Sequence, residues 1–190
     1  MELLIAGIII FFGSHSVIIY RTRLRDAIIE RFGVSGNRVL MSLLSLLGLV
    51  LIIWGYGQAR HDPIMIYYPP LWTRHLTLTL MLLPFILFAA VIFLGRIKYY
   101  VRHPVLFATL LWAVAHLLSN GTSADILLFG SFLIWSLADL WSLRYRSGEE
   151  IRLTASSAIR NDVFAVILGL LLYTAFIFGL HEWLIGIPPV

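Results

Sequence analysis

Six apolar stretches, almost free of charged side chains, constrain the fold of this 190-residue chain more than any other feature. At 1.5 Å per helical residue, such stretches approach or reach the ~30 Å thickness of bilayer hydrocarbon. They cover Leu3–Tyr20, Val39–Tyr56, Leu76–Leu94, Pro104–Leu118, Ile126–Leu143 and Val163–Leu180; the fourth is short, and the fifth contains Asp139. Only 13% of the residues are charged, against about 25% in soluble domains. The sequence therefore predicts an all-α integral membrane protein, a bundle of six transmembrane helices.

The basic residues predict how this bundle is oriented. Of the 14 Lys and Arg residues, only Arg60 and Arg74 lie on the opposite side, both in the second connection. The others lie in the loops after the first, third and fifth stretches: Arg21, Arg23, Arg25, Arg31 and Arg38, then Arg96, Lys98 and Arg102, then Arg144, Arg146, Arg152 and Arg160. By the positive-inside rule these three loops are cytoplasmic and both termini lie on the non-cytoplasmic side. The basic balance thus indicates a membrane surface as the partner, and no nucleic acid.

Loop lengths and composition predict three segments. Short connections join the first five helices, so we expect residues 1–145 to form one five-helix membrane bundle. Residues 146–162 form a cytoplasmic polar segment of mixed charge, and residues 163–190 form an appended C-terminal transmembrane helix. The chain has no Cys, which excludes thiolate nucleophiles and Cys-based metal sites.

Four histidines within or at the ends of the apolar stretches are the candidate functional residues: His15, His75, His103 and His116. Ionisable residues inside membrane helices usually face the bundle interior and serve function. The alternative is structural, because a neutral imidazole also forms hydrogen bonds to a backbone carbonyl of a neighbouring helix. Both interpretations stay open for these residues.

Helical spacing separates two of these histidines. His103 and His116 are 13 positions apart, which turns them about 220° away from each other around a helix, so they do not share a ligand. Trp112, His116 and Asn120 recur every four residues and form one stripe.

His15 follows Phe11 and Phe12 by about one helical turn, which gives a second stripe of aromatic rings and imidazole. Two such stripes on facing helices suit a planar cofactor. Bis-histidine haem is the leading candidate, because imidazole is a good iron ligand and helical bundles build such sites.

Five motifs occur in order over residues 1–145: GIIIFFGSHSVIIYRTRLR, LLGLVLIIWGYGQAR, PPLWTRHL, GRIKYYVRHPVLFATLLWAVAHLLSNG and LLFGSFLIWSLAD. Together they resemble the NnrU family. The resemblance implies a multi-pass protein of the bacterial inner (plasma) membrane linked to denitrification genes. The family is similar to the plant cis-ζ-carotene isomerase, an integral membrane protein that holds haem b between two histidines.

Carried over residue by residue, the resemblance implies His15 and His116 as the axial ligands of haem b. The isomerase has a cysteine where this chain has Ala113, so a thiolate ligand is excluded. Depth in the membrane favours a different partner. His15 is close to the cytoplasmic arginines and His116 is near the outer end of its helix, whereas His75 lies at the depth of His116. Both pairings, His15 with His116 and His75 with His116, therefore stay open.

The remaining expectations concern the surroundings of the haem. Arg74 or Arg102 would bind the propionates, since arginine pairs well with carboxylates. The second ring nitrogen of His116 would donate to the Asn120 carbonyl or to a backbone carbonyl. We expect His103 to orient Arg102 or to bind a headgroup or a propionate, and not to be an axial ligand.

Three functions fit these residues, and none assigns a catalytic residue. The first is a haem-dependent, isomerase-like or denitrification-linked enzyme acting on a hydrophobic small molecule or on nitric oxide. The second is a non-catalytic assembly or regulatory factor for a respiratory reductase, with a reductase or a second copy of the chain as partner. The third is a lipid-directed methyltransferase, because Arg102-His103-Pro104 also resembles that group and Glu149-Glu150 lies in a comparable place.

Overall fold

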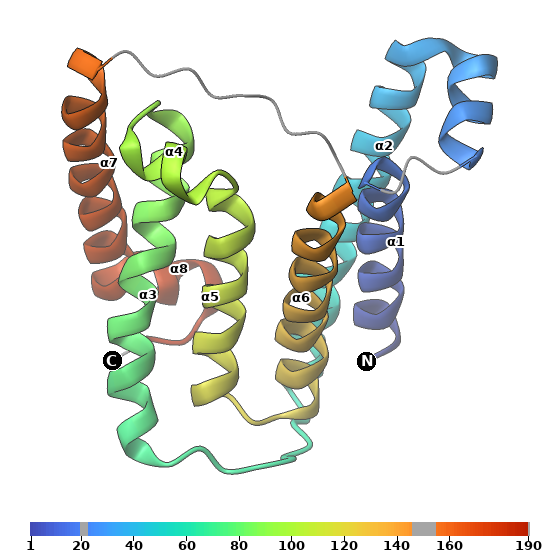
Figure 1. Cartoon of the computed structure of the whole chain (residues 1–190). Helices are drawn as coiled ribbons and strands as arrows, with labels where there is room; N and C mark the ends of the chain where they lie inside the picture. The colour runs from blue at the N-terminus through green and yellow to red at the C-terminus, as the bar shows by residue number, and fades with distance from the viewer. Residues whose placement is uncertain (20–22, 146–154, 190) are drawn as a thin grey trace. The chain divides into compact units, whose positions relative to one another are not determined.

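The computed structural model describes residues 1–19, 23–145 and 155–189, which are almost entirely helical (Figure 1). The elements are α1 (Glu2–Ile19), α2 (Arg23–Ala59), α3 (Leu71–Ile92), α4 (Arg96–Val101), α5 (Pro104–Ser119), α6 (Ser123–Ser142), the 3₁₀ turn η1 (Leu143–Tyr145), α7 (Ala155–Ala175), the π-helical turn η2 (Phe176–Leu180) and α8 (His181–Ile185). Within the described ranges there is no β-strand, only an isolated bridge between Met65 and Thr122. Glu149 and Glu150, singled out in the sequence, lie outside them.

Each of the six apolar stretches lies largely within a helix, which confirms the all-α membrane class. Four helical segments are long and apolar enough to cross a membrane: Arg23–Ala59, Leu71–Ile92, Ser123–Tyr145 and Ile159–Ile185. The apolar helices Glu2–Val17 and Pro104–Ser119 are shorter. The count of six spans and the side of the termini stay predictions.

The described helices form two compact units, and the three predicted segments stay predictions. The first unit contains 1–66 and 122–131, and the second contains 67–121 and 132–190. The C-terminal helix α7 packs on α3 inside the second unit, and it begins at Ala155, within the predicted polar segment.

In the first unit, glycines let α1 and α2 pack backbone to backbone as an antiparallel pair (Figure 1). A Cβ on Gly7 would lie 2.6 Å from the Ile52 nitrogen, and one on Gly55 would collide with Leu4. Further along, the hydroxyls of Ser14 and Ser45 are 2.9 Å apart and form a hydrogen bond. Small residues of this kind are typical where membrane helices approach closely.

The beginning of α2 corrects the expected loop after the first span. Residues 23–32 are helical, and the helix bends at Gly33, whose φ of 73° is accessible to glycine without strain. Leu24, Ile28 and Phe32 recur every four residues and therefore share one face of this short helix, which is amphipathic. A charged stretch of the sequence thus forms a short helix in place of an open loop.

In the second unit, α3 packs against both α5 and α7. Ala89 and Ala90 of α3 form a buried core with Ala165 of α7, and Gly169 of α7 lies against the backbone of Ile86. On the side of α5, the buried Thr77 hydroxyl donates to the Ala115 carbonyl at 2.8 Å.

Two side chains of α7, near the start of the last apolar span, hold the short helix α4 in place. The Asp162 carboxylate accepts the Ile97 N–H at 3.0 Å, which caps the start of α4 from a distant part of the chain. The Asn161 amide donates to the Leu94 carbonyl at 2.9 Å. These two bonds position the connection between α3 and α5, where a pocket lies.

Large apolar side chains cover the outer faces of the long helices. Examples with more than half of their surface exposed are Leu43, Leu46, Ile53, Ile134 and Leu171. A water-soluble protein rarely exposes large contiguous apolar patches. These faces indicate a lipid bilayer as their environment.

Candidate functional site

His116 has the hydrogen bond that a metal-binding imidazole needs. It lies in the last turn of α5, half-buried, and its Nδ1 is 2.9 Å from the Trp112 carbonyl oxygen one turn earlier. A carbonyl only accepts, so Nδ1 carries the proton and, in the neutral ring, Nε2 carries the lone pair. The Trp112 ring lies beside the imidazole, with centroids 5.1 Å apart, and packs edge-on against Phe132.

His15 repeats this arrangement in α1. Its Nδ1 is 2.8 Å from the Phe11 carbonyl oxygen, and the two rings stack with centroids 4.3 Å apart and planes 32° apart. Histidines that bind metals usually donate their other ring nitrogen to a carbonyl or carboxylate, which fixes tautomer and orientation. Both candidate axial ligands therefore fit an iron ligand locally.

The structure places the four candidate histidines in different surroundings. His15 belongs to the first unit, and His75, His103 and His116 belong to the second. His75 is exposed, and Thr77, two residues further on, is the α3 residue bonded to α5. Two residues correspond to about 200° of helix, so His75 does not face the helix that contains His116.

In the described part of the chain, no three or more His, Asp or Glu side chains gather as a metal site would require. A haem iron held between two imidazoles needs no such group, because the porphyrin supplies its other four ligands.

Asn120 and Arg74, two other predicted site residues, donate hydrogen bonds to backbone carbonyls at the end of α5 and near the C-terminus. Asn120 does not accept from His116; its side-chain amide and its backbone N–H both donate to the His116 carbonyl at 2.9 Å. Of the two acceptors expected for the His116 ring, the structure shows a backbone carbonyl, that of Trp112. Asn120 instead caps the end of α5. Arg74, in the first turn of α3, donates from Nε to the Pro189 carbonyl at 3.0 Å.

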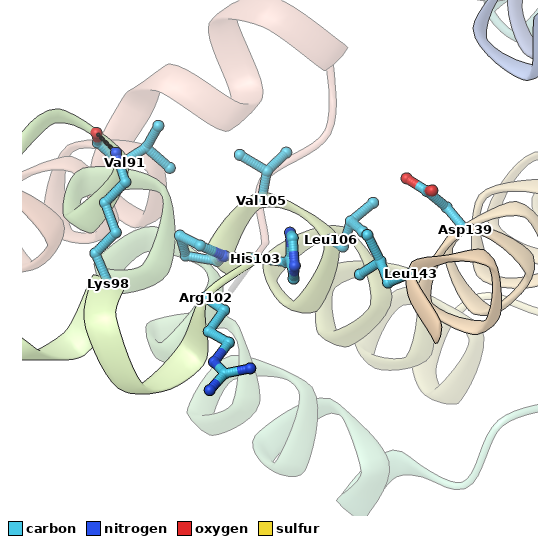
Figure 2. A pocket seen from close by; sticks show the side chains of 9 residues that line it. Val91, Lys98, Arg102, His103, Val105, Leu106, Asp139 and Leu143 are labelled. Carbon is cyan, nitrogen blue, oxygen red and sulfur yellow. Dashed lines mark hydrogen bonds between the residues drawn. The ribbon is translucent and has the colours of Figure 1, made fainter. Parts of the chain in front are cut away.

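A pocket of about 340 Å³ lies where α3, α4, α5 and α6 end or begin in the second unit (Figure 2). Its lining combines two cations, a histidine and a carboxylate with apolar side chains: Val91, Lys98, Arg102, His103, Pro104, Val105, Leu106, Asp139 and Leu143. Figure 2 shows Lys98 and Arg102 on one side of His103, and Asp139 on the other. The pocket is open to its surroundings, and Arg102 and Val105 of its lining are exposed.

The backbone at Arg102 is strained. Its φ of 58° and ψ of −49° are rare for a residue with a side chain, and it is the only described non-glycine residue with positive φ. The His103 N–H donates to the Val101 carbonyl at 2.6 Å, which closes a γ-turn of the uncommon, strained type. His103 then becomes the N-cap residue of α5, with Pro104 in the first helical position. Strain of this kind is concentrated at functional sites.

Sequence reasoning noted Arg102 and His103 but missed the other charged members of the pocket. Lys98 lies one helical turn before Arg102, and its Nζ donates to the Val91 carbonyl at 3.1 Å. Asp139 is 7% exposed and accepts from the Ser142 hydroxyl at 3.1 Å. An acidic residue in an apolar span is itself a signal of function, so Asp139 was detectable from the sequence.

A second polar cluster, in the first unit, joins α2 to α6. The Tyr56 hydroxyl donates to Asp125 at 2.6 Å, and the Arg60 guanidinium lies over the Tyr56 ring at 5.6 Å. Asp125 also accepts from the Thr122 N–H at 3.0 Å, while the Thr122 hydroxyl accepts the Asp125 N–H at 3.2 Å. This reciprocal pair is a capping box at the start of α6, so the cluster is structural.

The all-helical fold, with its apolar helix faces and polar helix ends, defines a multi-helix membrane protein. Small residues mediate the close contacts between pairs of its helices. The family model described as NnrU protein matches residues 3–189. The chain therefore belongs to the NnrU family, over nearly its whole length. Comparisons with curated proteins and with solved structures give no match.

Proposed function

We propose that this NnrU-family protein binds haem b in the bacterial inner membrane, with His116 and His15 as axial ligands. The observation that carries the proposal is the hydrogen bond shared by both imidazoles. In each, a carbonyl four residues earlier holds Nδ1–H and assigns the lone pair to Nε2. When bound, the haem would supply one-electron or Lewis-acid chemistry to an isomerase-like or denitrification-linked reaction.

The side chains around the two imidazoles have distinct roles in this proposal. Phe11 and Trp112 stack on the ligand rings and limit their rotation. Phe132 packs against Trp112 and holds it in place. Fixed ring orientations reduce the entropy lost when a ligand set forms.

Helix geometry favours Arg74 over Arg102 as a propionate partner. Arg102 precedes His116 by 14 positions, which is about 21 Å along a helix. Arg74 lies one turn before Thr77, which contacts Ala115, the neighbour of His116. Arg74 is therefore the arginine at the same end of the second unit as the proposed ligand.

The test is the absorption spectrum of the full-length protein purified from haem-replete cells. Low-spin, six-coordinate haem b is expected, with a Soret band that sharpens and shifts on dithionite reduction. His116→Ala and His15→Ala should each lose haem or become five-coordinate. The exposed His61, in the loop after α2, provides a matched control, and His61→Ala should keep the wild-type spectrum.

Three outcomes would decide against the proposal or its ligand pair. A colourless protein from haem-replete cells would favour the non-catalytic assembly or regulatory factor for a respiratory reductase. Unchanged low-spin haem in His116→Ala would remove the ligand set. If His75→Ala loses haem and His15→Ala does not, His75 is the second ligand.

A further inference from the structure

The pocket between the ends of α3, α4, α5 and α6 has a bipolar charge arrangement that the haem proposal does not use. Lys98 and Arg102 lie on one side of His103, and the buried Asp139 lies on the other (Figure 2). A ligand that is anionic at one end and cationic at the other matches this order of charges. A purely anionic ligand would bring its charge near the buried Asp139, and the repulsion between like charges costs free energy.

The pocket also lies where lipid headgroups are found. It is formed at helix ends, next to the basic residues that predict the cytoplasmic surface. Tyr99 and Tyr100 of α4 are 47% and 77% exposed, as interfacial aromatic residues usually are. Val105 lines the pocket and is 45% exposed, and Phe107 continues the exposed apolar surface of α5. A polar headgroup in the pocket would place acyl chains along this surface.

We propose that the pocket binds the headgroup of a phosphoethanolamine lipid. Arg102 and Lys98 contact the phosphate, and Asp139 accepts hydrogen bonds from the primary ammonium. Lys98 retains donors for this role, because an ammonium has three N–H groups and the Val91 carbonyl takes one. Arginine presents several donors in a planar fork that matches phosphate oxygens.

The strained γ-turn gives this proposal an independent test. Arg102 holds a positive φ that glycine would adopt more easily. If the arginine had only a structural role, Arg102→Gly would relieve strain and change nothing else. If Arg102 binds phosphate, the same substitution raises the melting temperature and lowers lipid affinity. The two measurements then move in opposite directions, which misfolding does not produce.

The experiment is native mass spectrometry of the full-length protein with equimolar phosphatidylethanolamine, phosphatidylcholine and phosphatidylglycerol of identical acyl chains. Phosphatidylethanolamine should be retained best, since choline lacks N–H donors and glycerol lacks the cation. Arg102→Gln and Arg102→Gly should weaken retention of all three by about tenfold, as expected for a charge-assisted hydrogen bond. Asp139→Asn should abolish only the preference for phosphatidylethanolamine over phosphatidylglycerol.

Arg96→Gln is the matched control, because Arg96 is an exposed arginine at the start of α4, the helix that Arg102 ends, and does not line the pocket. It should leave retention unchanged. Soluble phosphoethanolamine forms the second arm: if it displaces the lipid at equal concentration, the ligand is a free phosphate ester with the same chemistry. Equal retention of the three lipids by the wild type, unchanged retention in Arg102→Gln, or a preference that survives Asp139→Asn would each overturn the proposal. The readout is independent of haem content.

Discussion

The backbone nitrogen of Phe11 in α1 lies 2.7 Å from the point where a Cβ on Gly48 of α2 would be. No side chain fits there without separating the helices. We therefore expect Gly48→Leu to destabilise the first unit by about 2 kcal/mol, the usual cost of overpacking. Thermal unfolding in detergent would measure the effect.

Gly57 of the same helix provides the control for Gly48. A Cβ on Gly57 meets nothing within 4 Å, so Gly57→Leu should leave stability equal or higher, because leucine is the better helix former. Equal melting temperatures for Gly48→Leu and the wild type would contradict the backbone-to-backbone packing of α1 and α2.

A second prediction concerns the capping box of α6. Asp125→Ala removes the half of the capping box that accepts from the Thr122 N–H, at a cost of about 1 kcal/mol. It also leaves the Tyr56 hydroxyl without its acceptor, which adds about 1–3 kcal/mol. Asp125→Asn keeps a side-chain oxygen and should cost less. A double-mutant cycle with Tyr56→Phe would measure the coupling, and Tyr68→Phe, at an 82% exposed tyrosine, should be neutral. Additive effects of the two substitutions would show that the hydrogen bond contributes no stability.

A third prediction separates Asn120 from His116. Because Asn120 donates to the carbonyl of His116 and not to its ring, Asn120→Ala should weaken the end of α5 without changing the coordination of a bound haem. The expected result is a lower melting temperature with an unchanged low-spin spectrum. A shift to five-coordinate haem in Asn120→Ala would mean that its side chain also supports the ligand.

Membrane orientation gives a fourth prediction. Alkaline phosphatase fused after Tyr56 or Gly121 should be active, and a fluorescent protein fused after Ser35 or Glu149 should fluoresce in the cytoplasm. Because the chain has no Cys, single cysteines at Ser35 and Tyr68 also allow labelling of intact cells with an impermeant maleimide. Label at Ser35 but not at Tyr68 would reverse the predicted orientation.

The helical class was predictable because membrane-spanning character is a local property of the sequence. Each apolar stretch forms its own backbone hydrogen bonds in lipid, so its helix does not depend on its neighbours. The two short helical pieces in basic loops were not predictable in this way. Residues 23–32 bend away at Gly33, and α4 is capped by Asp162, a residue 65 positions later.

The two candidate sites differ in the same way: one depends on local spacing in the sequence and the other on how the helices pack. The Nδ1 bond of His116 spans four residues, so helical spacing alone predicts a backbone carbonyl within reach. The pocket instead requires Asp139 of α6 to line the same space as Arg102 and His103. That juxtaposition depends on how helices pack, which no local pattern encodes.

The capping of α4 by Asp162 has a consequence for biosynthesis. Helices α3 to α6 are translated and can enter the membrane before the ribosome reaches Asn161 and Asp162. Until then, the start of α4 and the Leu94 carbonyl lack the two side-chain bonds that hold them in the finished protein. A chain that ends prematurely before α7 would therefore carry every residue of the pocket lining but not the clasp that fixes α4. The start of α4 is therefore held in place only after the first residues of the last apolar span have been made.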